Sequence, residues 1–273
     1  MHDFEFQRYV TVGQYLATDS PLHHLDPRAR LVSGAFLLIA ITTAPHLSGL
    51  GLALALILLA LVAARIPLSY ALRGLVAPLP FILFLALLQI LFGSPGNEFP
   101  AWFTLGPLHI SKMDLLTGCI IIARFAALIL LISLTSAIIS TSELVHSLQA
   151  LLRPLAALGI PTQDLVLMAQ VTLRFLPLLA MEAERIAKAQ ASRGAEWGTG
   201  KTGILRRVRQ AMPLLVPLFL NSLQRAEALA LAMEARGYHG GKGRTSMIEL
   251  RFRFTDAAAL VVSSALSAVI VLL

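Results

Sequence analysis

The chain has 273 residues, of which 57% are hydrophobic and only 14% charged, and its mean hydropathy is +0.77. Its long charge-free runs exceed what a soluble core needs, which excludes an ordinary soluble domain and predicts an all-α polytopic membrane protein. The formal net charge is +7, and the single cysteine, Cys119, excludes an internal disulfide framework or thiolate metal cluster.

The first thirty residues are polar and mixed, without the short apolar stretch and cleavage site of a secretory signal, so we expect this segment to be retained. Asp26 and Pro27 predict the start of the first helix, with Asp26 as its N-cap. His23 and His24 stand just before this cap, as solvated loop residues often do. We therefore expect no metal site.

Charge-free runs predict the membrane spans, because a helix needs about 20 mostly apolar residues to cross the hydrocarbon. Leu31–Ala64 carries no charge and is broken by proline and glycine at Ala44–Gly49, which predicts two short spans. Three further runs, Gly74–Asn97, Leu115–Ser142 and Ala257–Leu273, bring the prediction to about five crossings.

Arg124 lies inside the fourth of these spans. A charge near the middle of a span costs roughly 2.5–3.5 kcal/mol on insertion scales, so this guanidinium should face protein and have a partner. A structural bond to backbone carbonyls, or to hydroxyls such as those of Ser133 or Thr135, is one interpretation. A role along a substrate path is the other.

Residues 140–253 contain 15 Lys and Arg against 8 Asp and Glu, and charges cut their apolar runs to fifteen residues or fewer. Fifteen helical residues extend only about 22 Å, so we expect this segment to form a helical domain outside the bilayer. The predicted parts are therefore 1–139 with four spans, 140–253, and 254–273 with the last span. The placement of Lys and Arg predicts a cytoplasmic N-terminus and basic domain, with the C-terminus outside.

Within the basic domain, Ser140–Glu143 has the spacing of a capping box and opens a helix expected to stop at Leu158–Pro161. Two longer helices follow, from about Thr162 to Arg193 and from about Ile204 to Arg236. Their carboxylates, such as Glu182, are expected to form surface ion pairs. Four prolines should kink or break these helices and so shape their crossing: Pro154, Pro177, Pro213 and Pro217.

Each of the two longer helices ends in the same motif, a small residue followed by Arg and Gly, with an aromatic residue within three positions of the glycine. The two copies are Ser192, Arg193, Gly194 and Ala235, Arg236, Gly237. One interpretation is simple helix termination, because glycine accepts the left-handed C′ position and the helix dipole favours a cation beside it. The other is that each Arg projects from a helix tip into an acidic groove of a partner.

The two small-Arg-Gly motifs resemble signatures of a known family, the integral-membrane T components of energy-coupling factor transporters. In the first motif Ser192 stands in place of the commoner Ala. The stretch "GQYLATDSPLHHLDPRARL" is similar to the family's entry to the first span. "TLRFLPLLAMEAERIAKAQASRG" and "ALAMEARGY" are similar to its two long coupling helices. The resemblance covers essentially the whole chain.

The resemblance implies a non-catalytic scaffold in which two ABC-type ATPases each receive one coupling-helix tip and a separate S component captures the substrate. It implies no cofactor and no nucleic-acid partner. The segments Gly198–Gly203 and Gly240–Thr245 contain glycine and lysine but lack the spacing of a phosphate-binding loop. Apolar faces on the coupling helices should pack under the spans or the S component, with these positions singled out: Leu215, Leu218, Pro177, Pro213 and Pro217.

The entry segment favours a T component for uptake of a vitamin or similar micronutrient, while a dedicated cobalt or nickel T component is the alternative. A stand-alone secondary transporter is a further alternative. It would need several polar residues along a path through the membrane, and among the predicted spans only Arg124 qualifies.

Overall fold

The computed structural model describes residues 16, 18–92, 103–105, 108–110, 112–154, 159, 161–194, 204–240 and 252–273. The chain divides into two compact units, with breaks after residues 148 and 247. The described residues of 13–148 and 248–273 form what we call the bundle unit. Those of 149–247 form the paired-helix unit.

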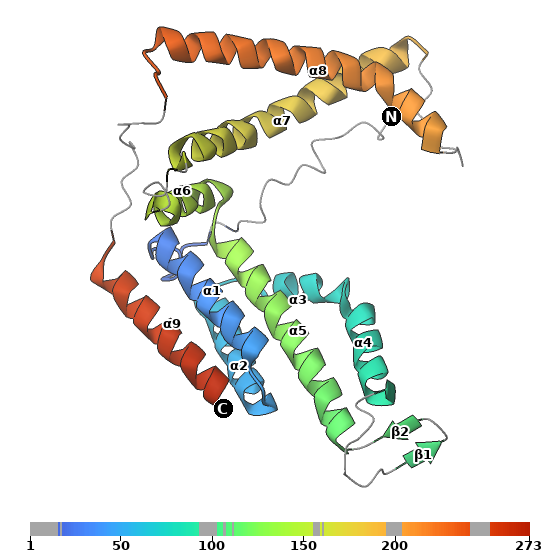
Figure 1. The fold of residues 1–273 in the computed structure, drawn as a ribbon, viewed down its shortest axis with the longest axis vertical. Helices are drawn as coiled ribbons and strands as arrows, with labels where there is room; N and C mark the ends of the chain where they lie inside the picture. The colour runs from blue at the N-terminus through green and yellow to red at the C-terminus, as the bar shows by residue number, and fades with distance from the viewer. Residues whose placement is uncertain are drawn as a thin grey trace. The chain divides into compact units, whose positions relative to one another are not determined.

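The bundle unit is built of helices that pack side by side, with α5 against α1, α2, α3 and α4, and α9 along α1 (Figure 1). A short antiparallel hairpin, β1 (Phe103–Leu105) and β2 (Leu108–Ile110), pairs Phe103 with Ile110. The helices are α1 (Pro27–Thr43), α2 (Leu47–Ala63), α3 (Leu68–Val76), α4 (Leu79–Phe92), α5 (Lys112–Ile138) and α9 (Phe254–Leu272).

Local signals at the start of α1 act as predicted. The Asp26 carboxylate accepts a hydrogen bond from the Arg28 backbone nitrogen at 2.9 Å, and Pro27 occupies the first turn. The Asp26 backbone nitrogen in turn donates to the buried Asp256 carboxylate at 2.8 Å. The cap of α1 is thereby tied to the first turn of α9.

The third predicted span, Gly74–Asn97, differs from the structure. Its first part is a separate helix, α3, which meets α4 at an angle of 59°. Pro78 and Pro80 account for the break, because a proline removes a backbone donor and clashes with the preceding turn. The span is therefore a bent pair rather than one straight helix.

The core of the bundle unit lies where α1, α2, α5 and α9 meet, around the fully buried side chains of Ile41, Leu50, Ile57 and Ile270. Gly49 is required at one contact in this core, since a Cβ there would overlap the Ile270 carbonyl oxygen. Nearby, the Ser48 hydroxyl donates to the Leu273 carbonyl at 2.7 Å. The start of α2 and the end of α9 are therefore in close contact.

Helix α6 (Thr141–Leu152) lies across the division between the units. Its capping box is confirmed: the Ser140 nitrogen donates to Glu143 at 3.0 Å and the Glu143 nitrogen to the Ser140 hydroxyl at 3.2 Å. The expected end near Leu158 is wrong, because α6 stops at Leu152. Pro154 follows in a short 3₁₀ turn, which explains the earlier stop.

The paired-helix unit consists of α7 (Thr162–Ser192) and α8 (Ile204–Ala235), which cross each other (Figure 1). Both helices begin and end within one residue of the bounds expected from the sequence. Both are amphipathic.

Within the described residues, four stretches of helix are long and apolar enough to span a membrane: α5, α7, Met212–Ala235 of α8, and α9. The bent pair α3 and α4 makes a fifth candidate, and α2 is a shorter apolar helix. Length and apolarity thus support the all-α polytopic class. The expectation that α7 and α8 are too short in apolar length to span a membrane is wrong, because both contain a stretch that is long and apolar enough. Their placement outside the bilayer therefore rests on the charge pattern alone.

Candidate functional site

Both small-Arg-Gly motifs lie at helix ends, as predicted. Gly194 and Gly237 adopt left-handed backbone angles, with φ of 86° and 76°. No described atom lies within 4 Å of where a Cβ would stand on either glycine. Each glycine therefore ends its helix through its backbone freedom, while Arg193 and Arg236 stand exposed just before it.

The end of α8 is a complete Schellman motif. The Tyr238 nitrogen donates to the Met233 carbonyl at 3.0 Å, and the Gly237 nitrogen donates to the Glu234 carbonyl at 2.9 Å. The end of α7 has the equivalent inner bond, from the Gly194 nitrogen to the Ala191 carbonyl at 3.0 Å. The two tips thus share a left-handed glycine and the same inner hydrogen bond, and an exposed arginine precedes each glycine.

Side-chain bonds between α7 and α8 follow one antiparallel register. The Arg225 guanidinium donates to Glu182 at 3.1 Å, and the Gln190 amide donates to the Pro213 carbonyl at 3.5 Å. Pro213 to Arg236 covers 23 residues, or roughly 35 Å of helix. The two arginine tips therefore lie at opposite ends of the pair.

Glu182 links the two helices near the middle of α7. Besides Arg225, it accepts a hydrogen bond from the Asn221 amide at 3.2 Å. An ion pair between Glu182 and Arg225 is one of those expected from the sequence, and a second forms between Lys188 and Glu184 at 2.6 Å. The first is half-buried and joins two helices, so it helps to hold the crossing.

Pro177 lies inside α7, and Pro213 and Pro217 lie inside α8, so none of these three prolines breaks its helix. Pro217 has no backbone N–H, which leaves the Pro213 carbonyl without its usual partner one turn later. The Gln190 side chain supplies that missing donor from the other helix. The proline thus creates a bonding site that α7 fills.

Tyr238 follows the α8 tip and bonds back to the start of α7. Its hydroxyl donates to the Asp164 carboxylate at 3.2 Å, and both side chains are half-buried. In the sequence, Tyr238 is distinguished only as the aromatic residue that follows the second small-Arg-Gly motif. Its partner, 74 positions earlier, carries no local signal.

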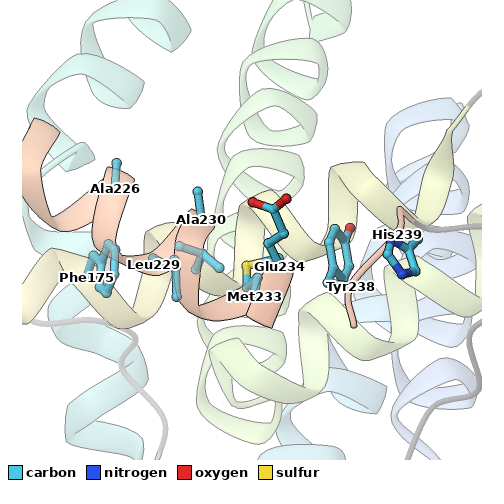
Figure 2. Close-up of a pocket in the computed structure, with 9 residues that line it drawn as sticks. Phe175, Ala226, Leu229, Ala230, Met233, Glu234, Tyr238 and His239 are labelled. Carbon is cyan, nitrogen blue, oxygen red and sulfur yellow. The ribbon is translucent and has the colours of Figure 1, made fainter. Parts of the chain in front are cut away.

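A hollow of about 490 Å³ lies between α7 and the second half of α8. Figure 2 shows Leu229, Ala230 and Met233 along α8, with Phe175 of α7 beside Leu229 at one end and Tyr238 and His239 beyond the tip at the other. Glu234 brings a carboxylate to the rim of this mainly apolar wall. The hollow therefore borders the α8 tip directly.

Both helices of the paired unit leave apolar faces uncovered. None of the described side chains of α8, from Met212 to Ala235, is buried. Leu215 is 51% exposed, and Leu218 beside it is half-buried. Uncovered apolar surface of this extent is typical of an interaction site. The exposed α8 side chains at its centre are Met212, Leu215, Val216, Phe219, Leu220 and Leu223.

Arg124 lies apart from these helices, in the bundle unit, and its guanidinium donates to the Ala44 carbonyl at 2.6 Å. The expectation of a backbone carbonyl partner is confirmed, but the suggested hydroxyls of Ser133 and Thr135 are wrong. Those residues stand nine and eleven positions further along α5, roughly 14–17 Å away. Ala44 follows α1, so the bond stabilises the free carbonyl end of that helix.

Other candidate chemistry is limited in the described part of the chain. No group of three His, Cys, Asp or Glu residues there could hold a metal ion. His23 contacts the Ser20 hydroxyl and the Leu16 carbonyl, and His24 contacts Asp19. The segment Gly198–Gly203 lies outside the described residues. So does the segment Gly240–Thr245, except for Gly240 itself.

Together, these features define an all-α polytopic membrane protein with two crossed amphipathic helices, each ending in an exposed arginine. The chain matches the family described as cobalt transport protein, CbiQ, over residues 18–247. It is 39% identical over 255 residues to the energy-coupling factor transporter transmembrane protein EcfT of Heliobacterium modesticaldum, covering 93% of this chain and 94% of that protein.

Two further relatives carry the same name. The protein of Listeria innocua is 36% identical over 258 residues, which cover 94% of this chain and 96% of the relative. That of Bacillus subtilis is 36% identical over 253 residues, covering 92% and 93%. The chain belongs to the CbiQ/EcfT family, the transmembrane components of energy-coupling factor transporters.

Proposed function

We propose that this chain is the scaffold that transmits ATP-driven motion from two cytoplasmic ABC-type ATPases to a substrate-binding S component. One observation carries the proposal: two helix ends, each with an exposed arginine before a left-handed glycine, stand at opposite ends of one crossed pair. Two equivalent tips suit two equivalent partners. Helix termination alone would explain a glycine and a cation at either helix end, but it does not account for the same small-Arg-Gly motif on both long helices.

Each tip has the chemistry needed to occupy a groove. The planar guanidinium of Arg193 or Arg236 can bond a carboxylate or backbone carbonyls through two parallel donors. The glycine that follows has no side chain to keep the partner away. Closure of the ATPase pair would then move both tips, and the bonds through Glu182 would transmit that motion across the crossing.

The uncovered apolar faces support the second half of the proposal. Met212–Leu223 of α8 and Leu165–Met181 of α7 expose large apolar side chains that a solvated helix would not retain. An S component packed on these faces would bury them. Leu215 and Leu218 would contribute to that contact, and Pro177, Pro213 and Pro217 would set its shape.

The proposed orientation follows from charge. Residues 140–253 carry the basic surplus, so α7, α8 and the N-terminus would lie on the cytoplasmic side. The ATPases need that side for access to ATP. The C-terminus, one span later, would then lie outside.

The proposed cargo is a vitamin or similar micronutrient, captured by the S component rather than by this chain. A dedicated cobalt or nickel transporter is the alternative, and the description of the matched family favours it. The relatives' printed names specify no cargo. Uptake assays with each class of compound separate the two.

Co-purification from the native membrane tests the proposal. The tagged full chain should bring down two ATPase subunits and one S component in fixed ratio, and the complex should take up substrate in liposomes only when ATP is supplied. Transport by the chain alone after reconstitution would contradict the scaffold role. So would a purified chain that carries no ATPase under conditions that preserve uptake.

A further inference from the structure

Helix α6 is the described element that continues from the bundle unit into the paired-helix unit (Figure 1). Its residues up to Leu148 belong to the bundle unit, and the helix continues unbroken to Leu152. The other places where the division falls lie outside the described residues. Along the described backbone, a force that passes between the units therefore passes through α6.

Two residues, Ile139 and Ser140, form an elbow between the end of α5 and the start of α6. No other described helix packs along α6 over an extended length, and only Val145 and Ser147 among its side chains are buried. The direction in which α6 leaves the bundle therefore depends on the bonds that hold its first turn.

Arg30 extends to this elbow from the first turn of α1 and bonds to both sides of it. Its Nη1 donates to the carbonyl of Ile138, the last residue of α5, at 2.6 Å, and its Nη2 donates to the Glu143 carboxylate of α6 at 3.0 Å. The Arg30 side chain is only 6% exposed, so water competes little for these bonds. The first bond also places a cation at the carbonyl end of α5, where the helix dipole favours one.

Glu143 uses both of its carboxylate oxygens at the elbow. Its Oε1 accepts from Arg30, and its Oε2 accepts from the Ser140 backbone nitrogen at 3.0 Å. We call the bonds that Arg30 makes to Ile138 and Glu143 the elbow clamp. Through this clamp one guanidinium joins α1 to the end of α5 and to the start of α6.

A stabilising ion pair is the simpler explanation of these bonds. A pair anywhere in the bundle would serve that purpose, whereas this one closes the two-residue elbow from which α6 leaves the bundle. Without the clamp the elbow would be free to bend. Bending there would absorb a displacement of α6 before it reached the membrane helices.

We propose that Arg30 is a positioning residue for energy coupling, which fixes the α5–α6 elbow so that displacement of α6 moves the bundle instead of bending the elbow. The proposal rests on the coupling function proposed above. It adds the point at which the motion enters the bundle. Arg193 and Arg236 receive the motion at the helix tips, and Arg30 prevents its loss at the elbow.

The test measures whether the elbow bends when the ATPases close. Spin labels at exposed positions on α1 and α6, Ala35→Cys and Leu148→Cys in a Cys119→Ser background, report the distance across the elbow in the whole complex. This distance should be the same without nucleotide and with the ATPases trapped by ATP and vanadate. With Arg30→Met added, it should differ by several ångströms between the two states.

Arg124→Met is the matched control for Arg30→Met. The Arg124 guanidinium also donates to a carbonyl at the end of a helix, that of Ala44, but Arg124 lies 14 residues before Ile138 on α5. Its removal should leave the label distance independent of nucleotide. A wild-type distance that changes on trapping would overturn the proposal, as would an unchanged distance in Arg30→Met complexes that retain their ATPases.

The corresponding transport measurement is the ATP hydrolysed per tracer taken up in liposomes. The tracer is radioactive cobalt(II) or a radiolabelled vitamin, whichever the wild-type complex accumulates. Arg30→Met should raise this ratio about fivefold, the lower end of typical coupling between distant sites, while the ATPases stay bound. An unchanged ratio would overturn the proposal and leave the coupling function standing. Absence of ATPases from the wild-type complex would instead contradict the coupling function itself.

Glu143→Gln keeps the test decisive if Arg30→Met fails to fold, with exposed Glu227→Gln as its control. It weakens the other half of the clamp and should change the distance and the ratio in the same direction. Because both residues act through one clamp, the double variant should raise the ratio no further than Arg30→Met alone. Additive effects would contradict a shared role at the elbow.

Discussion

The Tyr238 hydroxyl donates a hydrogen bond to the Asp164 carboxylate, 3.2 Å away, and so joins the turn after the α8 tip to the first turn of α7. The bond closes the side of the paired-helix unit where the hollow of Figure 2 lies. It also connects the turn after the α8 tip directly to the other helix. Movement at Arg236 is therefore linked to the start of α7.

Tyr238→Phe removes this bond and leaves the ring in place. A hydrogen bond to a charged, half-buried group is worth about 1–2 kcal/mol, so amide hydrogen exchange at residues 233–240 should accelerate about 5- to 30-fold. Substrate uptake by the complex should fall. Thr172→Val, which removes an exposed hydroxyl bonded within α7, should change neither measurement. Unaltered exchange in Tyr238→Phe would mean that the bond does not restrain the tip.

The ion pair of Arg30 with Glu143 predicts a dependence of stability on pH. Burial alone would raise the pKa of Glu143, but hydrogen bonds from Ser140 and the Arg30 charge outweigh it and hold that pKa below its ordinary value of 4.5. A carboxylate with a lowered folded-state pKa stabilises the fold above its unfolded pKa. That stability is lost as the pH falls through the folded-state pKa.

Glu143→Gln should therefore unfold more easily than wild type at pH 7, by about 1 kcal/mol for a pair whose carboxylate side chain is 34% exposed. The difference should shrink as the pH falls below about 4.5 and vanish below the folded-state pKa. Thermal unfolding in detergent from pH 7 downward measures it. Exposed Glu227→Gln is the control. A difference that persists at the acidic end would exclude this explanation.

The sequence predicted the elements whose signals are local. The capping box at Ser140 and Glu143, the Asp26 cap and the glycine ends of α7 and α8 all depend on residues within one or two turns. Helix bounds in the paired unit followed from the same signals. Both small-Arg-Gly motifs and their positions at helix ends could therefore be predicted from the sequence.

Long-range partners were not predictable in the same way. Arg30 meets Glu143 across 113 positions, and Arg124 meets the Ala44 carbonyl across 80. Nothing near either arginine specifies its partner, because helix packing decides which groups meet. The bend between α3 and α4 is different, since Pro78 and Pro80 marked it and a search for charge-free runs alone overlooks prolines.

The exposed apolar face of α8 predicts a binding defect without a folding defect. Leu215→Asp together with Leu218→Asp places two charges where an apolar partner would pack, and should release the S component while the ATPases stay bound. Subunit ratios after affinity purification measure this. Leu231→Asp, 66% exposed and eight residues beyond Leu223 on the same helix, should assemble normally. Full retention of the S component in the double variant would remove this face from the interface.

Membrane topology can be tested at one position. With Cys119, which is free and exposed, replaced by Ser, a Ser69→Cys variant offers a single exposed thiol on α3 between Arg65 and Arg73. The positive-inside pattern predicts that an impermeant maleimide will label it only after the membrane is opened. Labelling of intact cells would reverse the proposed orientation.

If Arg193 and Arg236 dock the two ATPases as proposed, charge reversal at both tips should abolish that docking. Truncating one such arginine in a desolvated groove would cost about 2–5 kcal/mol of contact, and Arg193→Glu with Arg236→Glu would oppose an acidic groove as well. The backbone turns at Gly194 and Gly237 should persist, because glycine conformation maintains them. The matched control is Arg185→Glu, exposed on α7 away from both tips.

The measurement is the amount of ATPase that co-purifies with each tagged variant, alongside ATP-dependent uptake. The coupling account predicts that the double tip variant loses the ATPases and uptake, while Arg185→Glu retains both near wild-type levels. If the double tip variant binds the ATPases and transports as well as the control does, the two small-Arg-Gly motifs serve only to end their helices. That result would contradict the proposed docking of the ATPases.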